Sequence, residues 1–287
     1  MKLSNSPTSS FVPDGRPIED AWKRITHLGI GAHQDDLETM AYHGILQCFR
    51  RPDLWFGGVI CTSGGGSPRS GPYADVSNED MALLREKEQE RAAVVGEYGA
   101  LVQLRHSSAA IKDRNDTALL DDLKEVFSYC RPSIVYTHNP ADKHETHVAV
   151  ALAVVHGLRQ LPAASRPERL LGCEVWRSLD WLSDEDKVAL DIGGRDHLAA
   201  GLLGVYDSQI AGGKRYDLAA AGRRRANATY RHSHQTDVAK EIWYAMDLSP
   251  LLRDPALDID DYVLAYIDKF RDDVASKLRA HRRGSPA

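Results

Sequence analysis

The stretch ITHLGIGAHQDDLETM, residues 25–40, decides the fold that we predict for this chain. Residues 25–30 are a short, largely apolar run, which predicts a β-strand. From Leu37 onward, apolar residues recur at helical spacing as far as Cys48, so a helix is predicted to follow. A strand that leads directly into a helix forms half of a βα unit, and repeated βα units build mostly parallel sheets.

The same alternation continues through the first half of the chain and loosens beyond residue 161. Further strands are predicted at 55–62, 101–104, 133–138, 171–176, 187–192 and 241–248. Further helices are predicted at 81–98, 117–127, 148–158, 197–208, 218–230 and 259–279. The pattern predicts an α/β fold: a Rossmann-like, mostly parallel sheet flanked by helices, with a C-terminal α+β portion that completes the pocket.

The last predicted helix carries apolar and aromatic residues at the spacing of a core-facing stripe. They are Tyr262, Val263, Tyr266, Ile267 and Phe270. We therefore expect this helix to pack against the body of the protein.

Length and composition limit the class of protein. Of the 287 residues 43% are hydrophobic, which is enough for a sizeable core, and a net charge of −5 disfavours a nucleic-acid binder. No apolar run reaches the roughly 18 residues of a membrane span, and no signal peptide is apparent. The four scattered cysteines are typical of buried, reduced thiols, so we expect a cytoplasmic protein. The predicted organisation is a loose polar arm at 1–19, one domain at 20–280 (core 20–160, C-terminal portion 161–280) and a tail at 281–287.

Two polar clusters follow predicted strands. The first is GAHQDDLE, residues 31–38, and the second is HNPADKHETH, residues 138–147. Carboxyl ends of parallel strands are where ligands bind in open sheets, so both clusters are expected at one sheet edge. Two histidines with a carboxylate are a common set for a catalytic divalent metal. The alternative for the first cluster is a helix N-cap formed by an aspartate beside a surface histidine.

These motifs resemble the signature of the LmbE/PIG-L-like metal-dependent N-deacetylases. The matching residues are Ala32-His33-Gln34-Asp35-Asp36 and His144-Glu145-Thr146-His147, and the resemblance spans about residues 25–155. It implies removal of an N-acetyl group from an amino sugar or an amino-sugar-containing conjugate, such as one in natural-product or thiol-cofactor biosynthesis. It implies a small-molecule substrate and Zn²⁺ as the cofactor, with Fe²⁺ as another suitable divalent metal. A homo-oligomer is compatible with the sequence.

The resemblance also implies a role for each matching residue. His33, Asp36 and His147 would bind the metal, Asp35 would be the general base for the metal-bound water, and His144 would protonate the leaving amine and stabilise the oxyanion. These roles agree with amide hydrolysis, which needs an activated water, a base and a cationic donor.

Two substrate contacts are carried over as well. Arg85 would contact the sugar, with a surface ion pair to Glu88 as the alternative, and Asp113 would bind substrate, with a plain turn aspartate as the alternative. The loop at 63–80 is expected to be a lid or wall over the sugar. The basic segment at 222–235 is either a solvated helix face and loop or a rim that attracts an anionic group.

Two residues depart from the family pattern. Gln34 replaces a proline, and Thr146 stands where many members have an aspartate that orients the acid histidine. We therefore hypothesise that Asp142 holds His144 cationic. His138 either lines the pocket or ends its strand.

Other classes fit less well. They are an amidase of the same family for a larger conjugate, a non-haem iron oxygenase, a nucleotide-binding module and a non-catalytic sugar-binding relative. The oxygenase usually has His-x-Asp on an all-β barrel, and the loop at 63–80 lacks a phosphate-binding motif.

Overall fold

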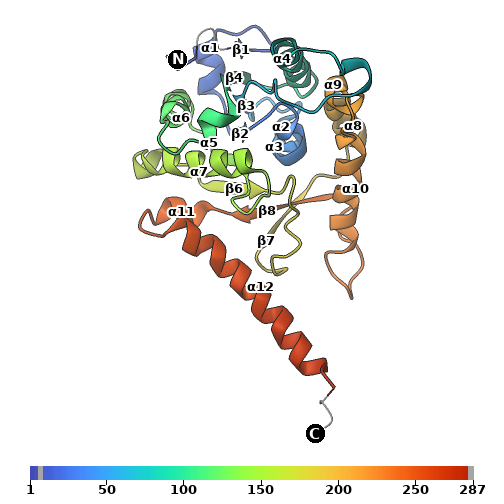
Figure 1. Cartoon of the computed structure of the whole chain (residues 1–287). Coiled ribbons are helices and arrows are strands. Elements are labelled where there is room, and N and C mark those ends of the chain that lie inside the picture. The colour runs from blue at the N-terminus through green and yellow to red at the C-terminus, as the bar shows by residue number, and fades with distance from the viewer. Residues whose placement is uncertain (6–8, 284–287) are drawn as a thin grey trace.

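A computed structural model describes residues 1–5 and 9–283, and within them eight strands form one sheet in the order β1-β4-β3-β2-β5-β6-β8-β7 (Figure 1). The strands are β1 (Ser9–Phe11), β2 (His27–Gly31), β3 (Phe56–Thr62), β4 (Ala100–His106), β5 (Ile134–His138), β6 (Arg169–Cys173), β7 (Lys187–Asp191) and β8 (Ile242–Asp247). Five of them, β4-β3-β2-β5-β6, run parallel, while β1 and β8 are antiparallel to their neighbours. The predicted α/β fold with a mostly parallel sheet is confirmed, and it is not the all-β barrel of an oxygenase.

The chain order creates a switch point between β2 and β5. From β2 the chain proceeds outward through β3 to β4, and then returns to place β5 on the other side of β2. Leu28 pairs with Val135 and Gly29 with Tyr136, so the carboxyl ends of these two strands are neighbours. Helices leaving the two strands on opposite sides open a crevice at such a point.

Helices cover both faces of the sheet (Figure 1). The helices are α1 (Ile18–Lys23), α2 (Asp36–Met40), α3 (Tyr42–Cys48), α4 (Asn78–Val95), α5 (Ser108–Lys112), α6 (Ala118–Tyr129), α7 (Glu145–Arg159), α8 (Asp196–Gly204), α9 (Asp207–Ile210), α10 (Tyr216–Thr229), α11 (Ser249–Arg253) and α12 (Ile259–His281), with 3₁₀ turns η1 (Gly71–Tyr73) and η2 (Ala163–Ser165). One buried cluster joins α1, α6, α7 and α11 to the sheet, and a second joins α2, α3, α4 and α8. Successive strand residues such as Val59 and Ile60 belong to different clusters, as alternation in a strand requires.

Two sequence-based expectations about the N-terminal half need correction. The predicted helix after β2 is divided at Ala41, whose φ of −103° and ψ of 13° separate α2 from α3. The N-terminal arm is not loose, because residues 9–11 pair with β4 and the backbone N–H of Ser4 donates to Asp122 of α6. Since β1 has only three residues, no alternation in the sequence marks it.

The final helix departs most from expectation. Ile259 and Val263 at the start of α12 are buried, but Ile267 and Phe270 are 40% and 44% exposed. Figure 1 shows α12 projecting away from the rest of the molecule. The prediction that these two residues belong to the core is therefore wrong.

The remaining expectations concern cysteines and membranes. All four cysteines are buried and unpaired, as predicted. Among the described helices, none combines the length and the apolar character that crossing a bilayer requires.

Candidate metal and catalytic site

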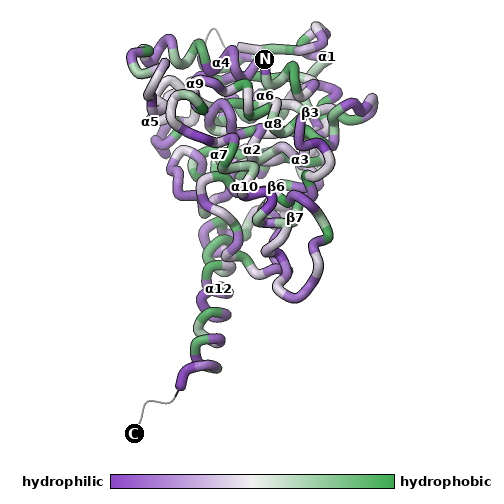
Figure 2. The backbone as a smooth tube through the Cα atoms, turned by 90° about the vertical axis from the view of Figure 1, so that its right-hand side faces the viewer, coloured by the Kyte–Doolittle hydropathy of each residue, from purple (hydrophilic) through white to green (hydrophobic). Residues whose placement is uncertain are grey.

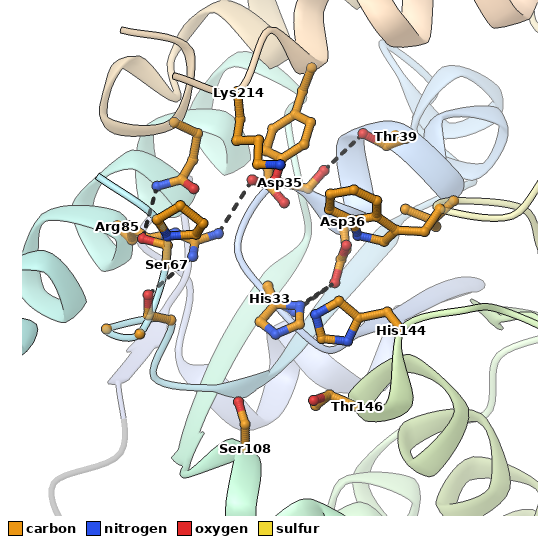
Figure 3. Close-up of a pocket in the computed structure, with 18 of the residues that line it drawn as sticks. His33, Asp35, Asp36, Thr39, Ser67, Arg85, Ser108, His144, Thr146 and Lys214 are labelled. Carbon is orange, nitrogen blue, oxygen red and sulfur yellow. Dashed lines mark hydrogen bonds and ion pairs between the residues drawn. The ribbon is translucent and has the colours of Figure 1, made fainter. Parts of the chain in front are cut away.

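The two polar clusters meet at the switch point of the sheet. The loop after β2 carries His33 and Asp35 and leads into α2 at Asp36, while the segment after β5 leads through His144 into α7. Figure 3 shows His33, Asp35, Asp36 and His144 around one pocket. Side chains 111 residues apart in sequence thus share one site, because parallel strands bring their carboxyl ends together.

His33, Asp36 and His147 lie at mutual distances that suit a metal ion. Nδ1 of His33 is 3.4 Å from Oδ2 of Asp36 and 3.3 Å from Nε2 of His147, which is 3.5 Å from Oδ1 of Asp36. Ligands that bind zinc at about 2.0–2.1 Å in tetrahedral geometry are roughly 3.4 Å apart. Two imidazoles and one carboxylate also form a donor set for zinc or iron, so these residues fit a divalent metal.

The charge states of the two buried ligands support this fit. Burial opposes ionisation of Asp36, but His147 and His138 together hold its pKa well below the usual range. Burial and the neighbouring His138 lower the pKa of His147 to about 4. At neutral pH the site therefore offers a carboxylate and a neutral imidazole, the forms that bind metals.

Asp142 orients His147. Its Oδ2 lies 3.2 Å from Nδ1 of His147, and its two oxygens also accept hydrogen bonds from the backbone N–H groups of Trp176 and Arg177. A carboxylate on the second ring nitrogen fixes the tautomer of a metal-binding histidine and raises its basicity. The side chain of Asp142 makes this contact with His147 and not with His144, so the hypothesis that Asp142 holds His144 cationic is not supported.

His138 is buried at the end of β5 and is committed to the backbone. The N–H of Ala32 donates to its Nε2 at 2.8 Å, which uses the lone pair that a metal would need. Its Nε2 also lies 3.3 Å from Asp36, so proximity alone groups Asp36, His138 and His147 as another potential ligand set. Because of the hydrogen bond to Ala32, we assign His138 a structural role: it does not line the pocket and it ends its strand.

Asp35 has a strained backbone conformation. Its φ is 87°, in the left-handed region, which costs a non-glycine residue of order 1 kcal/mol. It occupies the N-cap position of α2 but makes no capping hydrogen bond with its side chain, so the N-cap alternative is wrong. Oδ2 of Asp35 lies 3.3 Å from Nη2 of Arg85.

The pKa of the Asp35 carboxyl reflects two opposing influences. Burial raises it well above its ordinary value, and the Arg85 guanidinium acts in the opposite direction. A raised pKa moves a carboxylate toward the range in which it can accept a proton and release it again near neutral pH.

His144 stands beside the three potential ligands without a carboxylate partner. Its ring stacks on His147 at 4.5 Å and meets His33 edge-on at 5.0 Å. Nδ1 has no hydrogen-bond partner among the described residues. Burial and the nearby His33 lower its pKa. Thr146 lines the pocket but does not hydrogen-bond to His144.

The predicted substrate contacts have different positions. Arg85 lines the pocket, but its guanidinium donates to the carbonyls of Gln34 and Gly64 as well as to Asp35. Glu88 accepts hydrogen bonds from Ser208, so the surface ion pair with Arg85 does not form. Asp113 lies outside the pocket lining and accepts from the N–H of Asn115, which is the arrangement of a plain turn aspartate.

The pocket has a volume of about 1190 Å³. Residues of the loop at 63–80 form one wall, where Gly64 adopts a φ of +72° and a Cβ would lie only 2.1 Å from Oε1 of Gln34. The C-terminal portion supplies another wall, as predicted, but apart from the basic segment the sequence did not indicate which residues form it. We call Trp176, Lys214, Tyr216 and Arg223 the C-terminal wall, and His33, Asp35, Asp36 and His144 the pocket floor.

The C-terminal wall combines aromatic rings with cations. Trp176 and Tyr216 meet edge to face at 6.1 Å, and Nζ of Lys214 lies 5.1 Å from the Trp176 ring centre. Arg223 donates to the carbonyl of Val175. No motif unites these residues, since they come from the loop after β6 and from the region of α10. Among the four residues, only Arg223 lies in the basic segment at 222–235, for which a pocket rim was one of the two interpretations.

Fold and site together define an α/β protein with a two-histidine, one-carboxylate site at its switch point. The model of the family described as PIG-L: GlcNAc-PI de-N-acetylase matches residues 28–158, which include both clusters. The resemblance to the LmbE/PIG-L-like family is therefore confirmed over this segment. No curated protein matches the chain.

Solved structures share the fold at low sequence identity. N,N′-diacetylchitobiose deacetylase from Pyrococcus horikoshii has a TM-score of 0.60 at 15% identity, covering 80% of this chain and 85% of its own. The A40926 pseudoaglycone deacetylase Dbv21 has a TM-score of 0.56 at 15% identity, covering 78% and 97%. 4-Carboxy-2-hydroxymuconate hydratase from Pseudomonas putida has a TM-score of 0.54 at 14% identity, covering 78% and 96%. Because a hydratase shares the fold with deacetylases, the reaction must be argued from the site.

Proposed function

We propose that this protein is a metal-dependent hydrolase that removes an N-acetyl group from an amino sugar or an amino-sugar-containing conjugate. The observation that carries the proposal is the position of Asp35, a buried carboxylate in a strained backbone conformation next to three side chains at metal-binding distances. The family match supports hydrolysis of an N-acetyl amide as the reaction.

The proposed ligands are His33, Asp36 and His147, with zinc as the metal. When bound, a divalent metal polarises an amide carbonyl and lowers the pKa of water, so that attack becomes feasible near neutral pH. The residues of this chain have three further tasks: to take a proton from the attacking water, to stabilise negative charge on the carbonyl oxygen and to protonate the leaving nitrogen.

Asp35 is the proposed general base. It is not one of the three ligands, and its ion pair with Arg85 favours the ionised form that can accept a proton. The αL backbone of Asp35 separates its side chain from that of Asp36, so the two adjacent carboxylates can have different tasks.

His144 is the proposed acid and oxyanion donor. Its ring lines the pocket beside His33 and His147, where a reacting group would lie. Because its pKa is lowered, His144 is mostly neutral at pH 7 until a negative charge develops beside it.

The experiment that tests the proposal is acetate release from a panel of N-acetylglucosaminyl compounds, with and without a chelator. We expect release that stops on chelation and returns when zinc or ferrous iron is added. Chelator-insensitive release, or full activity of Asp35→Ala, would falsify the mechanism.

A larger conjugate is the second candidate substrate, and the size of the pocket favours it. The volume of about 1190 Å³ exceeds the range of roughly 300–1,000 Å³ that is usual for small-molecule sites. Lys143 and Lys214 line the pocket and form no ion pair with a described carboxylate, so they favour an anionic group on that conjugate. A kcat/KM that is higher for anionic glycosides than for N-acetylglucosamine would support this candidate, and equal values would exclude it.

A further inference from the structure

The projecting helix α12 is anchored at its beginning and exposed beyond. Ile259 and Val263 are buried in the core, and the hydroxyl of Tyr262 donates to the carbonyl of Asp247 at 2.6 Å. Lys269 forms ion pairs with Glu185 and Asp186. From residue 270 to the end of the described chain, the ion pairs of α12 stay within the helix. Figure 2 shows this part of α12 extending well beyond the body.

The exposed part of α12 carries one apolar stripe. Its members are Ile267, Phe270, Val274 and Leu278, which are 40%, 44%, 38% and 67% exposed. At 3.6 residues per turn these four positions fall within an arc of about 80°, in line with buried Val263. A stripe this narrow is typical of a seam between two helices, and all four of its members are exposed.

The stripe is nearly symmetric about residue 272. If a second α12 ran antiparallel with a two-fold axis at that position, Phe270 would lie opposite Val274, and Ile267 would lie one residue from the position opposite Leu278. Both of these pairs occur twice in such an arrangement, as an isologous interface requires.

The charges of α12 are complementary in the same arrangement. Residues 260–273 carry five Asp and two basic residues, whereas residues 274–283 carry four Lys or Arg and no acidic residue. Antiparallel pairing brings Asp260 and Asp261 near the Arg282 and Arg283 of the second copy. Parallel pairing would place like charges together, and the five aspartates also disfavour adsorption to an anionic membrane.

We propose that the α12 stripe is a self-association surface, on which a second copy of this chain docks its own α12 in antiparallel orientation. A helix of 23 residues spans about 35 Å, and it gains most of its stability from packing an apolar face. The proposal concerns assembly and is independent of the proposed deacetylase activity.

Sedimentation equilibrium of the full chain at micromolar concentrations tests the proposal. We expect a dimer for the wild type and an increase of at least about 100-fold in the dissociation constant for Phe270→Glu, which removes an apolar side chain from both copies and adds two charges. Ser276→Glu is the matched control, because this exposed residue lies on the opposite side of α12 and should leave the dimer intact.

Charge exchange tests the orientation. Asp260→Arg/Asp261→Arg and Arg282→Asp/Arg283→Asp should each weaken the dimer at least about tenfold, and the chain carrying all four changes should recover it. A wild-type monomer, a dimer that survives Phe270→Glu, or failure of the fourfold variant to recover would overturn the proposal. So would co-sedimentation of a monomeric wild type with phosphatidylcholine–phosphatidylserine vesicles.

Discussion

The pocket floor and the C-terminal wall face the same cavity but are built differently. Two of the three proposed ligands are fixed by a neighbour: on the floor Asp36 accepts from the backbone N–H of His33 at 2.6 Å, and beside the floor Asp142 orients His147. On the wall, the ammonium group of Lys214 lies over the ring of Trp176, and Tyr216 contacts the same ring. A fixed floor suits chemistry, and an adaptable wall suits recognition of a variable substituent.

The difference between floor and wall leads to a graded set of expectations. Changes on the floor should abolish metal binding or the chemical step, whereas changes on the wall should alter affinity for substrate. A wall variant that lost the metal, or a ligand variant with an effect on KM alone, would contradict this division.

The largest effect is expected for Asp36→Asn. Loss of the carboxylate charge should prevent stoichiometric zinc binding and reduce acetate release by at least about 10³-fold. Metal content after dialysis, measured by mass spectrometry, checks the first effect. His138→Gln is the control, because an amide oxygen can still accept the Ala32 N–H and His138 is not a proposed ligand. Loss of zinc from His138→Gln would show that His138 is a ligand and would contradict the structural role that we assign to it.

The next effect is expected for Asp35→Asn, which removes the proposed base but no ligand. We expect kcat to fall by about 10²–10⁴-fold while zinc content is unchanged. Steady-state kinetics and metal analysis on the same preparation measure both quantities. If zinc were lost together with activity, Asp35 would have to be counted as a ligand.

Asp142→Asn should have an intermediate effect, which is a lower affinity of the site for zinc. The amide is a weaker acceptor for the imidazole N–H of His147, so affinity for zinc should drop by about 10–100-fold. Competition with a chromogenic chelator gives the dissociation constant. Unchanged affinity would show that the contact does not tune His147.

Arg85→Gln distinguishes two possible roles of Arg85: to lower the pKa of Asp35, or to contact the sugar. Burial raises the pKa of Asp35 and Arg85 opposes the rise, so removal of the cation should raise this pKa further. The base must be ionised, and therefore the acid limb of the kcat/KM profile should shift to higher pH by roughly one unit. A profile that keeps its position while KM rises would favour the sugar contact.

The smallest effects are expected on the C-terminal wall. Trp176→Ala and Lys214→Gln should each raise KM by about threefold to tenfold and change kcat little, because neither residue contacts the proposed ligands by hydrogen bonds. The Lys214 effect should be confined to anionic substrates. An equal effect on neutral substrates would argue for packing rather than charge recognition.

The sequence predicted the pocket floor well because its residues are local to two strand ends. The motif at 32–36 and the histidine pair at 144 and 147 each follow a strand in sequence, and a parallel sheet brings such positions together. Which side chains hydrogen-bond to one another in the folded site was less predictable. Asp142 is two residues from His144 and accepts from its backbone N–H, yet the imidazole that its carboxylate binds is that of His147, since the first turn of α7 brings His147 back toward it.

Burial was the other property that local patterns could not determine. The spacing of Ile267 and Phe270 is that of a core stripe, and it correctly indicated an amphipathic helix. Whether such a stripe meets the body depends on where the preceding strand and turn direct the helix. Here β8 and α11 lead α12 outward, so the stripe remains exposed.

The sequence by itself determined the βα alternation, the residues of the pocket floor and the resemblance to the family, because these depend on short-range periodicity and on motifs within a few residues. Only the tertiary structure decided that His138 is committed to the Ala32 backbone, that Arg85 pairs with Asp35, and that Trp176 and Lys214 close the pocket. Each of these contacts joins segments more than 35 residues apart. Such contacts arise from the order and direction of strands, which no local stretch of sequence encodes.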